Sequence, residues 1–114
     1  MQIPMITTNA NFNGNIIFVK GKNKERMIMS DFFNKFAKVE LNKIKQDIAS
    51  KDYNLYIKSN GDNYNTFNIC AAKSFREATN MKNDITVERK FLPNILYFTR
   101  KAMTNFEEKS RYFI

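Results

Sequence analysis

Apolar residues between positions 30 and 50 recur with the period of an amphipathic helix. They follow one another at steps of four, four, three and four: Phe33, Ala37, Leu41, Ile44 and Ile48. At about 100° per residue these positions share one face, with Phe36 beside them, and lysine and asparagine lie on the opposite face. Ser30 suits the N-cap, because its hydroxyl can accept a hydrogen bond from a first-turn N–H. The pattern predicts one continuous helix over 30–50.

Two segments after this helix alternate apolar and polar residues, as half-buried strands do. They cover 53–58 and 63–69, on either side of an Asn-Gly turn. A two-residue turn would leave Phe67 and Ile69 on the wrong side of the hairpin. An odd loop, Ser59–Gly61 with Gly61 in the left-handed region, sets the odd-numbered residues of both strands together. We therefore expect a hairpin with an apolar inner face and a polar outer face.

The first part of the chain predicts an arm followed by another hairpin. Residues 1–14 contain Pro4 and an asparagine-rich run, and we expect them to form a flexible arm. Residues 15–20 favour a strand, and 25–29 favour a return strand after a basic turn.

The last part of the chain predicts a helix, a strand and a second long helix. Helix-forming residues cover 70–80, and 85–90 alternates as a strand does. Pro93 fits the first turn of the final helix, where its missing N–H costs nothing, and an apolar stripe continues from there to about Glu108.

The order of these elements, ββ-α-ββ-α-β-α, predicts the α+β class. Two or three helices would pack on an antiparallel or mixed sheet of about four or five strands. The 114 residues fit one domain, 1–114, and contain no linker, repeat or low-complexity block. We expect a core that is stable without metal or disulfide.

Positive charge dominates the chain, with 19 Lys and Arg against 11 Asp and Glu and a net charge of +8. Such an excess attracts polyanions. Arginine is scarce beside lysine, which favours charge-led contact over bidentate readout of bases. We expect the partner to be nucleic acid, a nucleoprotein complex or an acidic protein surface, bound with weak sequence preference and strong salt dependence.

Three groups of residues are candidates for this contact. Lysines and one arginine crowd the tip of the predicted N-terminal hairpin, others lie on the polar face of the long helix, and tyrosines on the outer face of the second hairpin can stack bases. A solvated helix face, and tyrosines packed under another element, are the alternative interpretations. The candidate residues are Lys20, Lys22, Lys24, Arg26, Lys35, Lys38, Lys45, Tyr56, Lys58 and Tyr64.

Several kinds of chemistry are excluded by composition. The chain has no histidine and one cysteine, which excludes Ser-His-Asp and Cys-His catalysis and structural zinc sites. Cys70 has small apolar neighbours, so we expect a buried, reduced thiol in a cytoplasmic protein. No apolar run approaches the eighteen or more residues of a membrane span. We therefore expect a non-enzymatic binding protein with no catalytic residue, metal or cofactor.

One short motif indicates a different function. Val87-Glu88-Arg89-Lys90 resembles the Glu-x-Lys element of restriction-endonuclease-like nucleases. The resemblance implies that Glu88 and an upstream aspartate, Asp62 or Asp84, would hold Mg²⁺ while Lys90 assists the attacking water. A solvated charge pair on a strand face is the alternative interpretation.

A protein-binding inhibitor is the alternative function from another class. Small chains without catalytic groups, rich in the AT-coded residues Asn, Lys and Ile, are typical of phage and mobile-element proteins that block host machinery, anti-CRISPR proteins among them. This likeness concerns general form and no motif. Such a protein would act in the host cytoplasm.

Overall fold

Four strands form one mixed sheet in the computed structural model, which describes residues 13–19, 25–59, 65–80 and 84–112. In spatial order the strands are β1 (Ile16–Phe18), β2 (Asn54–Ser59), β3 (Thr66–Ala72) and β4 (Ile85–Glu88). β1 runs parallel to β2, and the other neighbouring strands are antiparallel. The predicted α+β class is confirmed.

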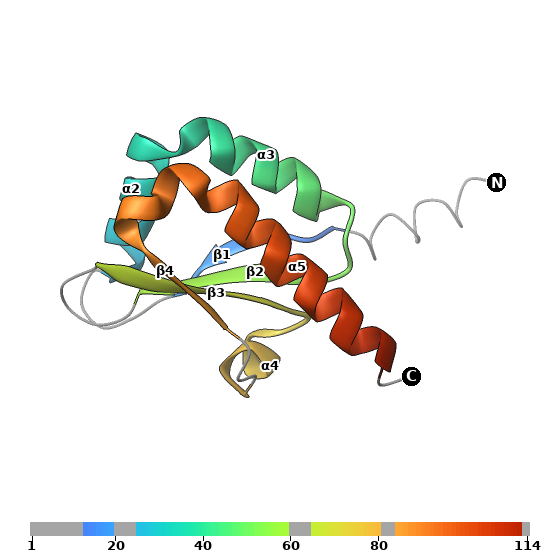
Figure 1. Cartoon of the computed structure of the whole chain (residues 1–114). Coiled ribbons are helices and arrows are strands. Elements are labelled where there is room, and N and C mark those ends of the chain that lie inside the picture. Colours follow the sequence, from blue (N-terminus) through green and yellow to red (C-terminus); the bar gives the residue numbers. More distant parts are fainter. Residues whose placement is uncertain (1–12, 20–24, 60–64, 81–83, 113–114) are drawn as a thin grey trace.

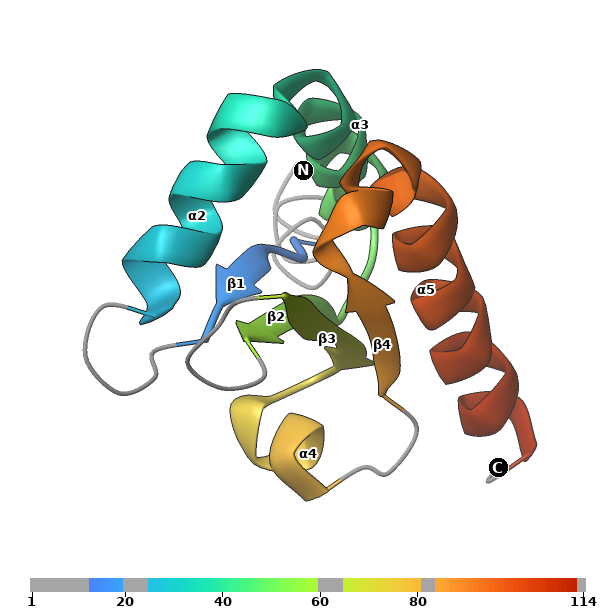
Figure 2. The ribbon, with the colours of Figure 1, turned by 60° about the vertical axis from the view of Figure 1, so that its left-hand side comes forward.

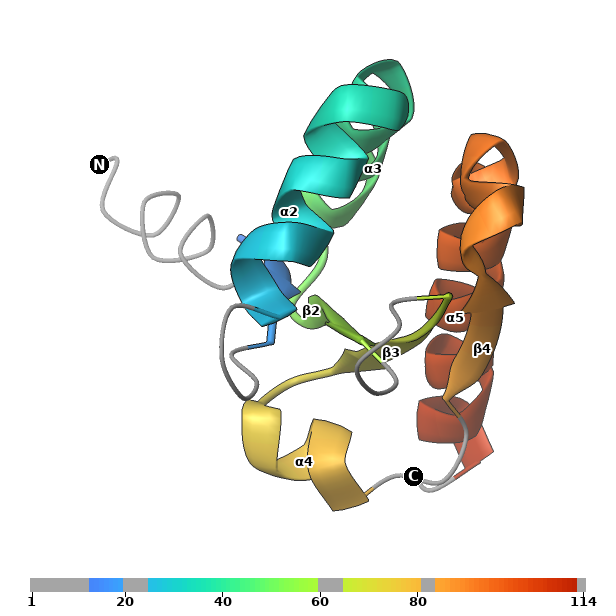
Figure 3. The ribbon, with the colours of Figure 1, turned by 90° about the vertical axis from the view of Figure 1, so that its left-hand side faces the viewer.

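Helices cover both faces of this sheet unequally (Figure 1). One face carries three helices: α2 (Glu25–Phe36), α3 (Lys38–Ala49) and α5 (Ile95–Tyr112). The short α4 (Phe75–Asn80) lies on the opposite face, and Figures 2 and 3 show the same two-sided arrangement. A 3₁₀ helix, η1 (Arg89–Asn94), connects β4 to α5. Among the described residues, no helix is both long and apolar enough to cross a membrane.

The main core lies between the sheet and the three-helix layer. Phe33 of α2 is fully buried at its centre, with its ring centroid 5.2 Å from that of Phe18 and 5.4 Å from that of Phe67, both edge-on. The stripe predicted for 30–50 supplies Phe33, Ala37, Leu41, Ile44 and Ile48 to this core. Its assignment as the core-facing stripe is therefore confirmed.

The hairpin of β2 and β3 has the predicted parity but a longer loop. Ile57 pairs with Ile69, so the odd-numbered residues of both strands face the main core. Ser59 pairs with Phe67, and the residues between them, 60–66, are again odd in number. The predicted loop Ser59–Gly61 was too short, because pairing resumes only at Phe67.

The predicted long helix is two helices. Ala37 separates α2 from α3 with φ −144° and ψ 37°, and it is buried. Its N–H still donates to the Phe33 carbonyl at 2.9 Å, and its own carbonyl accepts from the Leu41 N–H at 2.8 Å. The apolar stripe therefore continues through a bend at which Ala37 keeps both of its backbone hydrogen bonds. The period of apolar residues is the same on both sides, so it cannot reveal such a bend.

The predicted N-terminal hairpin is wrong. Residues 25–29 begin α2, because Met29 is buried one turn before Phe33 and extends the helical stripe. Ser30 consequently lies inside this helix and is no N-cap. β1 lacks an antiparallel neighbour at 25–29 and pairs with β2, as a parallel strand must after a helical crossover. Within the predicted arm, Gly14 is buried; residues 1–12 lie outside the described part of the chain.

Two boundaries in the C-terminal half also differ from the prediction. Cys70, Ala71 and Ala72 belong to β3, because they pair with β2 and are buried on both faces of the sheet. Tertiary pairing overrides their helical propensity, and α4 starts only at Phe75. β4 ends at Glu88, and Pro93 lies in η1 before α5 begins.

Candidate nucleic-acid interface

Three of the predicted lysines lie together on the α2–α3 layer. Lys35 is in the last turn of α2, and Lys38 begins α3 just beyond the bend. Lys45 lies two turns further along α3, about 10.5 Å from Lys38 along the helix axis. All three are exposed, and none forms an ion pair with another described residue. We call Lys35, Lys38 and Lys45 the basic helical surface.

Four cations elsewhere in the described chain are locally neutralised. Four ion pairs join described side chains: Lys51–Glu107 at 2.9 Å, Lys73–Asp52 at 3.7 Å, Lys90–Glu88 at 3.2 Å and Arg100–Asp47 at 3.0 Å. Exposed pairs of this kind add little stability, but each cancels a positive charge at its site. The basic helical surface has no such pair and is therefore a better site for a polyanion than these four positions. Other exposed lysines without a described pair are Lys43, Lys58, Lys101 and Lys109.

A groove of about 470 Å³ runs between α3 and α5, and it holds two of these ion pairs, Lys51–Glu107 and Arg100–Asp47. Glu107 also accepts a hydrogen bond from the Tyr53 hydroxyl. Burial, followed by the neighbouring Glu107 carboxylate, raises the pKa of Tyr53 well above its usual value. Its ion pairs connect α3 to α5. Because both positive and negative side chains line the groove, it does not favour binding of an anion.

Aromatic rings and cations gather where α2 meets η1. The Lys35 Nζ lies 5.8 Å from the Phe36 ring centroid, and the Lys90 Nζ lies 5.4 Å from that of Phe91. The third contact joins the two elements, since Arg89 lies over Phe32. We call these six residues the aromatic end: Phe32, Lys35, Phe36, Arg89, Lys90 and Phe91.

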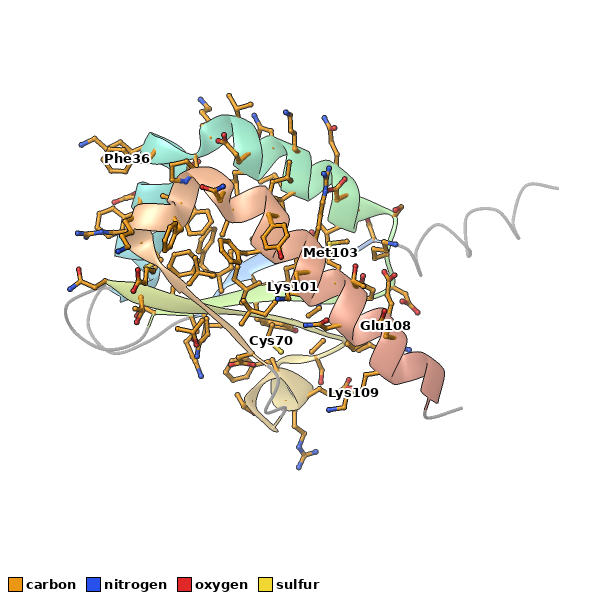
Figure 4. All side chains as sticks on the ribbon, in the orientation of Figure 1. Phe36, Cys70, Lys101, Met103, Glu108 and Lys109 are labelled. Carbon is orange, nitrogen blue, oxygen red and sulfur yellow. The ribbon has the colours of Figure 1, made fainter. Side chains whose placement is uncertain are left out.

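Two rings of the aromatic end are exposed to solvent. Phe36 is 62% exposed and Phe91 is 44% exposed. Figure 4 shows Phe36 projecting from the end of α2, away from the sheet. Phe32 precedes Phe36 by one turn, and their ring centroids are 6.4 Å apart. α2 therefore carries two neighbouring rings, Phe32 and Phe36, beside its core-facing stripe, which contains Phe33.

Sequence reasoning missed the aromatic end for identifiable reasons. The periodicity places Phe36 beside the apolar stripe of one straight helix, but it lies at the C-terminal end of α2 and is exposed. Arg89 was placed on a strand, whereas it starts η1 and lies near α2. The i, i+4 spacing of Phe32 and Phe36 was the available signal, because residues four apart are neighbours on a helix.

The tyrosine part of the prediction is wrong for Tyr56. Its side chain is 5% exposed and packs with Cys70, Ala72 and Ala78 beneath α4. The Phe75 ring lies over it, with centroids 6.1 Å apart. Tyr56 therefore presents no face to a base, since α4 covers the outer face that the alternation suggested was open.

The remaining predicted residues do not join the basic helical surface in the described structure. Lys58 is exposed on the α4 side of the sheet, opposite the α2–α3 layer. Arg26 belongs to the first turn of α2 and so to no hairpin tip. The other candidates lie outside the described residues: Lys20, Lys22, Lys24 and Tyr64.

Cys70 is a buried free thiol, as its apolar neighbours predicted. Burial, and then the nearby Asp84 carboxylate, raises the pKa of Cys70 to about 12. A small cavity of about 20 Å³ adjoins both side chains beneath α4. A thiol with so high a pKa stays protonated at neutral pH and makes a poor nucleophile.

Glu88 and Lys90 form an ion pair. This agrees with the interpretation of the Glu-x-Lys motif as a solvated charge pair. Asp84 precedes β4, so it lies about 13 Å from Glu88 along the strand at about 3.3 Å per residue. That separation prevents the two carboxylates from sharing one Mg²⁺. Asp62 lies outside the described residues, among which no three histidine, cysteine or carboxylate side chains cluster as a metal site.

No protein-family model, curated protein or solved structure matches this chain.

Proposed function

We propose that this protein is a non-enzymatic, cytoplasmic nucleic acid-binding protein that uses the basic helical surface. The observation that supports this function most is the row of exposed lysines without a described acidic partner, Lys35, Lys38 and Lys45. Phosphate oxygens are the ligands that such a row suits, because lysine is a flexible point charge with three donors. The net charge of +8 supplies long-range attraction for the same partner.

Lysine contacts of this kind determine how binding responds to sequence and salt. They fix the protein on the phosphate backbone but read no base, so preference among sequences is weak. Each neutralised phosphate releases counterions, and the logarithm of the binding constant then falls linearly with the logarithm of the salt concentration. Binding should therefore be strongest at low salt.

The test compares two double variants with equal loss of charge. Lys38→Gln with Lys45→Gln alters the basic helical surface, whereas Lys101→Gln with Lys109→Gln alters exposed lysines of α5 (Figure 4). Fluorescence anisotropy with labelled DNA and RNA over a salt series gives affinity and salt slope. We expect the first variant to lose affinity and about 1.4 to 1.8 units of slope.

Two results would contradict this proposal. Absence of binding to both DNA and RNA at low salt would remove the function. An equal loss in the two double variants would remove the basic helical surface as its site, because net charge alone would then account for binding.

A protein-binding inhibitor is the second candidate, and one observation favours it. Val39 is 64% exposed beside the equally open Phe36, which gives an apolar patch at the α2–α3 bend. Patches of this type are common where proteins associate. A pull-down from a bacterial lysate, repeated after nuclease digestion, separates the candidates, since a partner that survives digestion would favour the inhibitor.

A further inference from the structure

We infer that the aromatic end selects single-stranded nucleic acid, with bases stacked on Phe36 and Phe91 and phosphates held by the neighbouring cations. This inference rests on the proposed function and adds the class of nucleic acid. Its support comes from the exposed rings and their cations, of which Lys35 also belongs to the basic helical surface.

Exposed phenylalanine rings suit unpaired bases. Phe36 and Phe91 present open faces, whereas Phe33 is the phenylalanine of α2 that fills the core. A base can stack on such a face only when it is free of its own neighbours, and duplex bases are already stacked and paired. Because every base has a π-face, this contact tolerates any sequence, which agrees with the scarcity of arginine in the chain.

The cations beside the rings complete the site. Lys35 and Lys90 lie over rings at exposed positions, where a cation–π contact is weaker than the stacking of a base. A base can therefore take the ring face while the displaced lysine moves to the adjacent phosphate. Arg89 differs, because it lies over the half-buried Phe32 and can contact a phosphate without leaving its place between α2 and η1.

Charge around the aromatic end favours a polyanion over an apolar protein surface. Three cations, Lys35, Arg89 and Lys90, surround the rings. The described carboxylates nearest in sequence are Asp31, which precedes Phe32, and Glu88, which already pairs with Lys90 at 3.2 Å. The balance at this end remains positive, as a phosphate backbone requires.

A hollow beside η1 gives a nucleic-acid strand room to pass. Its volume is about 380 Å³, and it is lined by Asn65, Thr66, Glu88, Arg89 and Lys90. Arg89 and Lys90 are cations, and Asn65 and Thr66 are neutral and polar. The one carboxylate, Glu88, pairs with Lys90 at 3.2 Å, so Arg89 supplies the unpaired charge that a sugar-phosphate backbone requires.

The experiment measures binding of single strands and duplexes of equal length, in DNA and RNA, by fluorescence anisotropy. The test variant is Phe36→Leu with Phe91→Leu, which keeps apolar volume and removes both rings. The control is Phe75→Leu, an exposed phenylalanine on α4 across the sheet. Urea unfolding of each variant checks that the fold is retained.

We expect single strands to bind at least about tenfold more tightly than duplexes. The double variant should lose at least about fivefold in single-strand affinity, with duplex affinity and the control unchanged. A preference for DNA or for RNA is compatible with the inference, because bases stack on aromatic rings in both.

Three outcomes would overturn it. Duplexes bound as tightly as single strands, with the lysine variants still weakened, would reject strand selectivity and leave the proposed function intact. An equal loss in Phe75→Leu would show that the aromatic end is not the site. Capture of a protein partner that depends on Phe36 and Phe91, without change in nucleic-acid binding, would assign this surface to protein recognition.

Discussion

The guanidinium carbon of Arg89 lies 5.1 Å from the ring centroid of Phe32. This contact joins η1, which follows the last strand, to α2, which precedes the central hairpin in the sequence. It therefore brings together residues that are far apart in the chain and places the cations of η1 beside the rings of α2. The aromatic end exists because of this junction.

Replacing Arg89 with Gln should weaken binding more than it weakens folding. An exposed cation–π contact contributes about 0.5–1 kcal/mol, so the free energy of unfolding should fall by about that amount. Loss of one phosphate contact should reduce the salt slope by about one. Urea unfolding and anisotropy measure the two effects. Arg76→Gln, an exposed arginine of α4, is the matched control, and equal effects of both changes would contradict the role of Arg89.

Two phenylalanines of α2 should respond oppositely to truncation. Phe33 is fully buried between Phe18 and Phe67, so Phe33→Ala should cost about 3–5 kcal/mol of unfolding free energy. Phe36→Ala should change stability little, because that ring is exposed. Urea midpoints give both values, and the milder Phe33→Leu keeps the comparison measurable where the alanine variant unfolds. Similar costs at the two positions would contradict the described orientation of α2.

Gly14 should tolerate no side chain. A Cβ there would meet the backbone carbonyl oxygens of Tyr53 and Ile48, the second at 2.5 Å. Neither oxygen can move without shifting the end of α3 or the start of β2, so Gly14→Ala should destabilise the protein by about 1–3 kcal/mol. Thermal or urea unfolding checks this, with Ala49→Gly as a comparison at the exposed last residue of α3, where less than about 1 kcal/mol is expected. A neutral Gly14→Ala would show that this packing is loose.

Stability should fall at alkaline pH partly through Cys70. Its pKa rises from 9.0 to about 12 on folding, so the unfolded chain releases the thiol proton more readily than the folded one. The stabilisation is complete below about pH 9 and is lost as pH rises toward 12. Tyr53 acts in the same direction at higher pH, since its pKa is also raised.

Cys70→Ala isolates the contribution of the thiol. Urea midpoints of the variant should decline less than those of the wild type between neutral pH and about pH 10. Identical declines would contradict a buried, protonated thiol. A disulfide reagent offers a second measurement, because it should react with the native thiol only as fast as the protein opens.

The sequence predicted the parts of the fold that depend on local periodicity. Alternation placed Leu55, Ile57, Phe67 and Ile69 on one face of a hairpin, because a shift of one residue would expose them all. The stripe from Phe33 to Ile48 likewise marked the core face of α2 and α3. In both cases burial of one face is the dominant energy, and a short window of sequence records it.

Contacts between residues far apart in the chain cannot be predicted from a short window of sequence. Tyr56 follows a polar alternation, and only the return of α4 over the sheet buries it. The cations of the aromatic end gained their ring partners from a junction between α2 and η1, which no spacing within either segment specifies. The candidate site is therefore predicted only in part: Lys35, Lys38 and Lys45 share a surface, but the periodicity places Phe36 beside the core-facing stripe and gives Phe32 no role.

The parallel pairing of β1 with β2 sets an order for folding. Ile16 pairs with Leu55, whereas Ser59 pairs with Phe67 a few residues away. Closing the longer loop costs more chain entropy, so β1 should join the sheet after β2 and β3 have met. During synthesis β1 leaves the ribosome before β2 has been made, so β1 stays unpaired until β2 emerges. Pulsed hydrogen exchange should accordingly show the amide of Leu55, which is bonded to Asn15, protected later than those between β2 and β3.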